Sequence, residues 1–163
     1  MRVHSSVSLA VTAALIAVLA PITAAHAEDK PACALITAAE VSPILGVPAK
    51  AGPAIAPMAC SFLATSGPAH FMVMLTPAGG DAFQNLKMMI MSSNMDRTHP
   101  PAEQISGVGD QAAFFVLSTG DLYLTVFAKS RMIQLVVQHG SGPTTPARKS
   151  AMVDEAKRMI ARL

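Results

Sequence analysis

The sequence predicts an α+β protein: an antiparallel sheet of about five strands with three helices packed on it and one disulfide bond. Three observations lead to this prediction. Five short apolar runs occur, mostly separated by breaks that suit hairpins rather than helical crossovers, which favours antiparallel pairing. Three other segments carry helix signals, and the chain has two cysteines. Helices packed on an antiparallel sheet define the α+β class.

Residues 1–27 are typical of a secretory signal peptide. Arg2 provides a positive start, an Ala/Val/Leu-rich run follows, and residues 25–27 fit the small-x-small rule for cleavage. A transmembrane anchor is the alternative, because this run is nearly long enough to span a bilayer. Its alanine-rich composition and the switch to charge just after it argue against an anchor. We therefore expect residues 28–163 to form a single α+β domain, periplasmic or secreted, with no membrane span after cleavage.

The composition indicates a globular protein. Hydrophobic residues make up 52% of the chain and charged residues 13%, which is far from the composition of disordered proteins. Loss of Arg2 with the signal peptide reduces the 12 basic residues to 11, against 10 acidic residues, for a net charge of +1. This balance gives no electrostatic footprint for nucleic acid, so we expect no nucleic-acid partner.

The two cysteines, Cys33 and Cys60, predict one structural disulfide. An exported protein enters an oxidising compartment, where two cysteines most simply form a bridge. Three alternatives fit less well. A lipidated cysteine would directly follow the cleavage site, a metal site would need further ligands at short spacing, and a nucleophile would need a free thiolate.

The first helix is predicted to follow Cys33 closely and to be short. Thr37 and Glu40 form a capping-box pattern, in which each side chain bonds the backbone of the other residue. Pro43 removes a backbone donor, and Gly46 provides a typical helix end. A proline- and alanine-rich connection without periodicity follows.

Alternating apolar residues predict five strands. The second strand places Phe71, Val73 and Leu75 on one face, and His70, Met72 and Met74 on the other. The last three strands are separated by short breaks and should form an antiparallel meander. The predicted strands are Cys60–Ala64, His70–Thr76, Ala112–Leu117, Leu122–Ala128 and Met132–Gln138.

The middle helix is predicted to run from Asp81 to about Ser93, with a start resembling a capping box at Asp81 and Gln84. Its 3.6-residue period gives an apolar stripe for the core. The stripe consists of Phe83, Leu86, Met89 and Ile90.

The last helix is predicted to begin after Thr145, which can cap it, with Pro146 at its first position. On its solvent side, Asp154 and Glu155 are expected to pair with Lys157 and Arg158. Its core stripe consists of Met152, Ala156, Met159 and Leu163.

Four short motifs carry a resemblance. They read CALITAAEV at residues 33–41, LG at 45–46, CSF at 60–62 and GVGDQAAF at 107–114. The chain thereby resembles small exported or lipid-anchored bacterial domains of unknown function, which share the pattern C-x-L-L-T-x-x-E-V…L-G…C-x-[YF]…G-[VL]-G-D-x-A-[YF]. It departs from that pattern because Cys33 is not placed for lipidation and Ala113 precedes the aromatic residue. The resemblance implies an exported α+β domain with bridged cysteines, and it implies no catalytic or ligand residue.

Methionine is the unusual feature of the composition. Ten methionines follow the signal peptide, and the chain has no tryptophan. Met88, Met91 and Met95 fall within about 60° of one another on the side of the middle helix away from its core stripe. Core packing is the ordinary explanation for methionine, but an exposed methionine face suits adaptable binding of a protein or an apolar ligand. We therefore predict a non-enzymatic binding module whose partner is an envelope protein or a small apolar ligand.

Two other functions remain open. Imidazole and thioether groups are ligands for Cu(I), so His70, Met72 and Met74, joined by some of Met88, Met91 and Met95, could form a copper site. An unrecognised hydrolase is the second alternative. The sequence nominates no catalytic residue for it, because it lacks a nucleophile elbow, a phosphate loop, a dinucleotide fingerprint and a zinc-helix motif.

Overall fold

The chain folds around one antiparallel sheet. The computed structural model describes residues 30–53, 55–95, 98, 100–138 and 140–163, without side-chain detail for 80–83. The sheet has seven strands in the order β1-β2-β3-β7-β6-β5-β4, and all its pairings are antiparallel. The α+β class and the disulfide are confirmed, whereas the predicted signal peptide, residues 1–27, lies outside the described residues.

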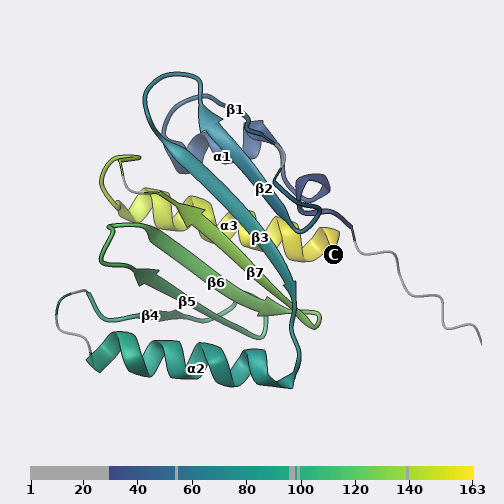
Figure 1. Cartoon of the computed structure of the whole chain (residues 1–163), viewed down its shortest axis with the longest axis vertical. Helices are drawn as coiled ribbons and strands as arrows, with labels where there is room; N and C mark the ends of the chain where they lie inside the picture. The colour runs from purple at the N-terminus through teal and green to yellow at the C-terminus, as the bar shows by residue number, and fades with distance from the viewer. Residues whose placement is uncertain (1–29, 54, 96–97, 99, 139) are drawn as a thin grey trace, which may run out of the picture.

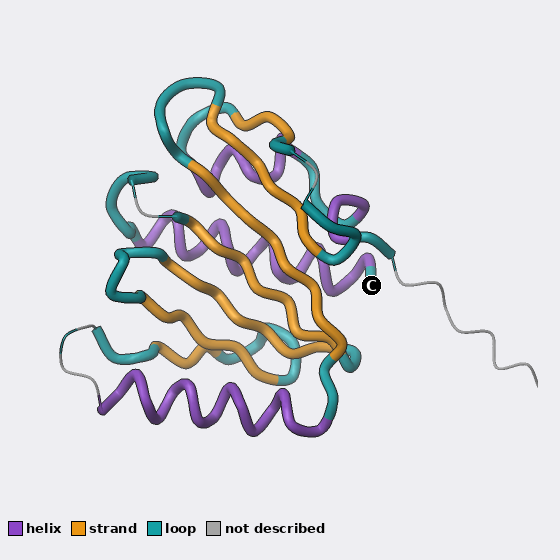
Figure 2. Tube along the Cα trace, in the orientation of Figure 1, coloured by secondary structure: helices purple, strands orange, loops and turns teal. Residues whose placement is uncertain are grey.

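Three α-helices and a short 3₁₀ helix accompany the strands (Figures 1 and 2). The strands are β1 (Ala49–Ala51), β2 (Ala59–Ala64), β3 (His70–Pro77), β4 (Glu103–Ile105), β5 (Gln111–Val116), β6 (Leu122–Ala128) and β7 (Arg131–Val137). The helices are η1 (Ala32–Ala34), α1 (Ala38–Leu45), α2 (Gly80–Met95) and α3 (Pro146–Arg162).

The prediction of about five strands is wrong by two, and the missed strands are the edges of the sheet. β1 and β4 have three residues each and lie in segments that the sequence marks as loops. Three residues are too few to display the alternation that identifies a strand. Pairing with β2 and β5 defines these edges instead, for example through Lys50 opposite Leu63 and Gln104 opposite Ala113.

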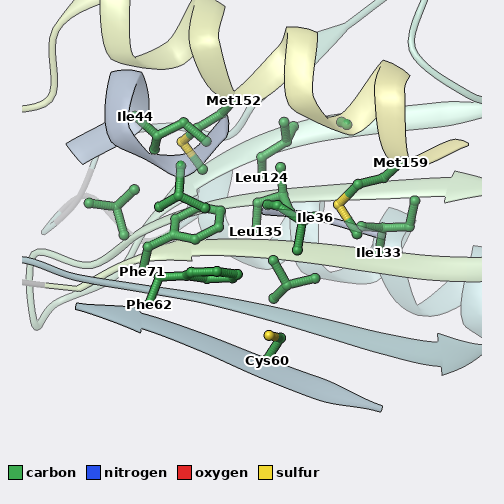
Figure 3. Packing of buried hydrophobic residues seen from close by; sticks show 14 of the residues in the cluster. Ile36, Ile44, Cys60, Phe62, Phe71, Leu124, Ile133, Leu135, Met152 and Met159 are labelled. Carbon is green, nitrogen blue, oxygen red and sulfur yellow. The ribbon is translucent and has the colours of Figure 1, made fainter. Parts of the chain in front are cut away.

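The two faces of the sheet differ. The face that we call the core face carries Phe71, Leu124 and Leu135, all fully buried, and α1 and α3 cover it. Figure 3 shows Met152 and Met159 of α3 directed into this cluster. The opposite face, the second face, carries the alternate residues of each strand, and α2 packs on it over β5 and β6. Figure 1 shows α1 and α3 behind the strands and α2 along the margin beside β4.

The disulfide and the capping box fix the N-terminal segment as predicted. Cys33 and Cys60 are bonded, which ties η1 to β2. The Thr37 hydroxyl accepts a hydrogen bond from the Glu40 backbone N–H, while the Thr37 backbone N–H donates to the Glu40 carboxylate at 2.9 Å. Gly46 ends α1 in the left-handed conformation with φ of 75°.

The C-terminal helix begins as predicted but differs in its polar side. Thr145 caps α3 and Pro146 opens it, while Met152 and Met159 are fully buried. Glu155 does bond Arg158, yet Glu155 is buried rather than on the solvent side. Burial raises the pKa of this carboxyl, opposed by the bond from Arg158. At about 100° per residue, Glu155 lies within about 60° of both Met152 and Met159 around the helix, so it shares the buried side of α3.

A charge network joins α1 to the end of α3. Arg162 donates to the Leu35 carbonyl at 2.7 Å and to both carboxylate oxygens of Glu40. These bonds, together with those from Thr37, lower the pKa of Glu40 to about 2 despite the opposing effect of burial. The network holds two segments that are far apart in the sequence.

This network predicts a specific loss of stability in acid. The pKa of Glu40 is lower in the folded protein than its ordinary 4.5. Its contribution to stability is therefore present above about pH 4.5 and is lost as the pH falls towards 2. We expect urea unfolding to show a smaller loss of stability over this window in Glu40→Gln than in wild type. Parallel acid profiles for the two proteins would contradict the assignment.

Candidate functional site

α2 is attached to the second face by a narrow apolar contact. Leu86 is buried against Ala113, Phe115 and Phe127, and Ile90 is half-buried beside it. The predicted core stripe is thus only partly correct, because Met89 is 40% exposed and the Phe83 side chain lies outside the described residues. Among the described side chains of α2, Leu86 and Ile90 make this contact, and a groove lies on each flank of the helix.

The outer side of α2 is lined with thioether groups. Met88 is 59% exposed, Met91 is 56% exposed and Met95 is 75% exposed. These three residues form the face that the helical period places away from Leu86, and we call them the methionine face. Large apolar side chains that stay in water in such a cluster are typical of surfaces that bind a partner or ligand.

One flank of α2 forms a groove of about 520 Å³ with β6 and β7. We call it the methionine groove, because Met88 and Met89 of α2 and Met132 of β7 line it with Leu86. Thr125 and Gln134 are the polar groups that the sheet contributes to it, and the Gln134 amide donates to the Thr125 hydroxyl at 3.5 Å.

The other flank forms a groove of about 680 Å³ against the segment that leads into β5. Lys87 and Met91 of α2 and Ser106–Gln111 line this loop-side groove. The backbone at Gly109 must stay free of a side chain, because φ is 60° and a Cβ there would lie 2.3 Å from the Phe127 carbonyl oxygen. The Gln111 side-chain oxygen is buried without a hydrogen-bond partner among the described residues.

The second face gathers most of the methionines of the described chain. Met72, Met74 and Met132 are half-buried there, on the same side of the sheet as α2 with its four exposed methionines. Tyr123 also lies on this face, and burial, with Asp121 nearby, raises the pKa of its hydroxyl, which keeps the group neutral. In contrast, the core face contains the fully buried Met152 and Met159.

The structure does not bring all six residues of the copper hypothesis together. His70, Met72 and Met74 share the second face as predicted, but none of them lines either groove beside α2. His70 and Met74 are four residues apart on one strand, or about 13 Å. The strand set and the helix set thus line different parts of the second face, although Met74 lies opposite Gln134, which lines the methionine groove.

The sheet residues of the methionine groove, Thr125, Met132 and Gln134, were not nominated from the sequence. The alternation within Met132–Gln138 places Met132 and Gln134 on one face, which could have been read from the sequence. The crossing of α2 over that face could not. The hydrolase alternative, for which the sequence nominates no catalytic residue, stays a prediction.

The fold and site define a class rather than a family: an antiparallel α+β domain with one disulfide and a methionine-rich second face. Within the described residues, no group of three His, Cys, Asp or Glu side chains could hold a metal ion, and no helix is long and apolar enough to cross a membrane. Searches against protein-family models, curated proteins and solved structures give no match to the chain.

Proposed function

We propose that the protein is an exported, non-enzymatic binding module whose methionine groove takes a small apolar ligand. The groove itself carries the proposal: its volume of about 520 Å³ lies within the range of small-molecule sites. Its wall is largely thioether and aliphatic, and the neighbouring Thr125 and Gln134 offer a few polar atoms to orient a ligand. This mixture of an apolar wall with few polar groups is typical of ligand sites.

Methionine suits this function because its side chain is unbranched and polarisable. A thioether wall can repack around ligands of different shape without loss of contact. Met88 contributes to both the groove and the methionine face, so a ligand or an envelope protein could meet the same residue.

Export is the other part of the proposal. The Cys33–Cys60 bond supports a periplasmic or secreted location, because structural disulfides persist in oxidising compartments. The signal-like composition of residues 1–27 gives the same indication. The resemblance to exported domains of unknown function agrees with both.

Titration with an apolar fluorophore, anilinonaphthalene sulfonate, tests the groove. We expect saturable binding that Met89→Glu weakens by about tenfold or more, because the new carboxylate would be desolvated by the bound probe. Met95→Glu is the matched control, since Met95 lies on the same helix and lines neither groove. Near-UV circular dichroism confirms that each variant retains its tertiary packing. Equal binding by Met89→Glu and Met95→Glu would contradict the proposal.

A further inference from the structure

A hydrogen bond to Gln138 orients the imidazole of His70 and uses only one of its two ring nitrogens. Its Nδ1 lies 2.7 Å from the side-chain oxygen of Gln138. An amide oxygen can only accept, so Nδ1 carries the hydrogen and the neutral ring has a lone pair on Nε2. Nε2 is buried and has no hydrogen-bond partner among the described residues. A buried acceptor of this kind needs a partner.

The same-face neighbours of His70 on the described strands include one thioether. Met72 follows His70 on the same face of β3, about 7 Å away along the strand. On the adjacent strands, Leu63 lies opposite His70 and Val136 lies opposite Met72, and both are aliphatic. Ser61, opposite Met72 on β2, already donates its hydroxyl to the Pro53 carbonyl at 2.9 Å.

Nε2 of His70 and the sulfur of Met72 are thus two electron-pair donors that belong to successive positions on the same face of β3. Neither can donate a hydrogen to the other. A cation that accepts both lone pairs would satisfy them together, and a thioether selects a soft cation such as Cu(I). Zn²⁺ fits poorly, because it takes four ligands from thiolate, imidazole and carboxylate groups.

We propose that His70 and Met72 form a Cu(I) site, with Nε2 and the Met72 sulfur as its ligands. Gln138 is the positioning residue, because a metal-bound histidine typically donates its other N–H to an oxygen that fixes the ring. Met74 stands about 7 Å further along the same face and can approach the ion from the side of Met72. This site is separate from the methionine groove and goes beyond the proposed function.

Anaerobic titration of the disulfide-bonded protein with Cu(I), supplied as its acetonitrile complex against a chromophoric Cu(I) chelator, tests the site. We expect one equivalent of Cu(I) to leave the chelator. Met72→Leu, which nearly conserves volume, should weaken binding by tenfold or more, and Gln138→Leu should weaken it by about 10–100-fold. Met95→Leu is the matched control and should bind as wild type does.

Ring ¹⁵N NMR gives a readout that is independent of affinity. Cu(I) should shift the Nε2 resonance of His70 in wild type and in Met95→Leu. Wild-type affinity in Met72→Leu, an unshifted Nε2 resonance, or equal loss of binding in Met95→Leu would overturn the proposal. The Met72→Leu protein should bind anilinonaphthalene sulfonate with wild-type affinity, because Met72 does not line the methionine groove. Failure of the copper proposal can therefore be distinguished from failure of the groove proposal.

Discussion

Replacing Cys33 and Cys60 together with alanine is expected to lower the free energy of unfolding by about 3–4 kcal/mol. The bridge spans a sequence separation of 27 residues and closes a loop that contains all of α1 and β1. Its removal restores the conformational entropy of that loop in the unfolded chain. Alanine is the better replacement at Cys60, because this residue is buried and a serine hydroxyl there would add its own cost.

Urea unfolding of the double variant and of wild type, both without reductant, measures this effect. Wild type treated with reductant provides the control, because it lacks the bond but keeps both side chains. It should unfold near the midpoint of the double variant. If the double variant unfolded at the wild-type urea concentration, the bridge would contribute nothing to stability, and η1 would be held by packing alone.

The N-terminal segment explains why one bridge should matter so much. α1 has eight residues, includes Pro43, and would be marginal as an isolated helix. β1 is a three-residue edge strand. The segment is therefore held from outside: by the bridge to β2, by Arg162 at Glu40 and Leu35, and by the burial of Ile44.

The sequence predicted the strands that are long enough to show an apolar sequence pattern. The five longer strands have six to eight residues, and β3 shows the predicted alternation of buried and half-buried residues. The strands β1 and β4 exist because their neighbours offer unpaired backbone groups. This pairing depends on the neighbouring strands of the folded sheet, and a segment of three residues is too short to show an alternating sequence pattern.

The candidate site was predictable in its parts but not in its arrangement. Helical geometry placed Met88, Met91 and Met95 on one side of α2, and strand geometry placed Met72 and Met74 on one face of β3. Neither pattern specifies where a helix crosses a sheet. Leu86 sets that crossing over β5 and β6 rather than over β3. Met132 therefore lines the groove and His70 does not.

The second large effect is expected at Arg148, whose side chain joins three segments through backbone carbonyls. Its guanidinium donates to Ile44 at 2.8 Å and to Leu45 at the end of α1. It also donates to Ser141, Gly142 and Pro143 in the turn before α3. Arg148→Met should lower the free energy of unfolding by roughly 3 kcal/mol, because hydrogen bonds to a charged group are lost together and carbonyls are left unpaired.

Conservative and matched variants separate hydrogen bonding from charge in this effect. Arg148→Lys keeps the charge but cannot present the planar fork of donors, so it should recover only part of the loss. Lys157→Met removes a charge from an exposed position of the same helix and should change stability by less than about 0.5 kcal/mol. Full recovery in Arg148→Lys would mean that charge near the end of α1, rather than the directed bonds, holds α1 to α3. We expect the directed hydrogen bonds, rather than the charge, to cause most of the stability loss. Five carbonyl oxygens lie within 3.4 Å of this one guanidinium.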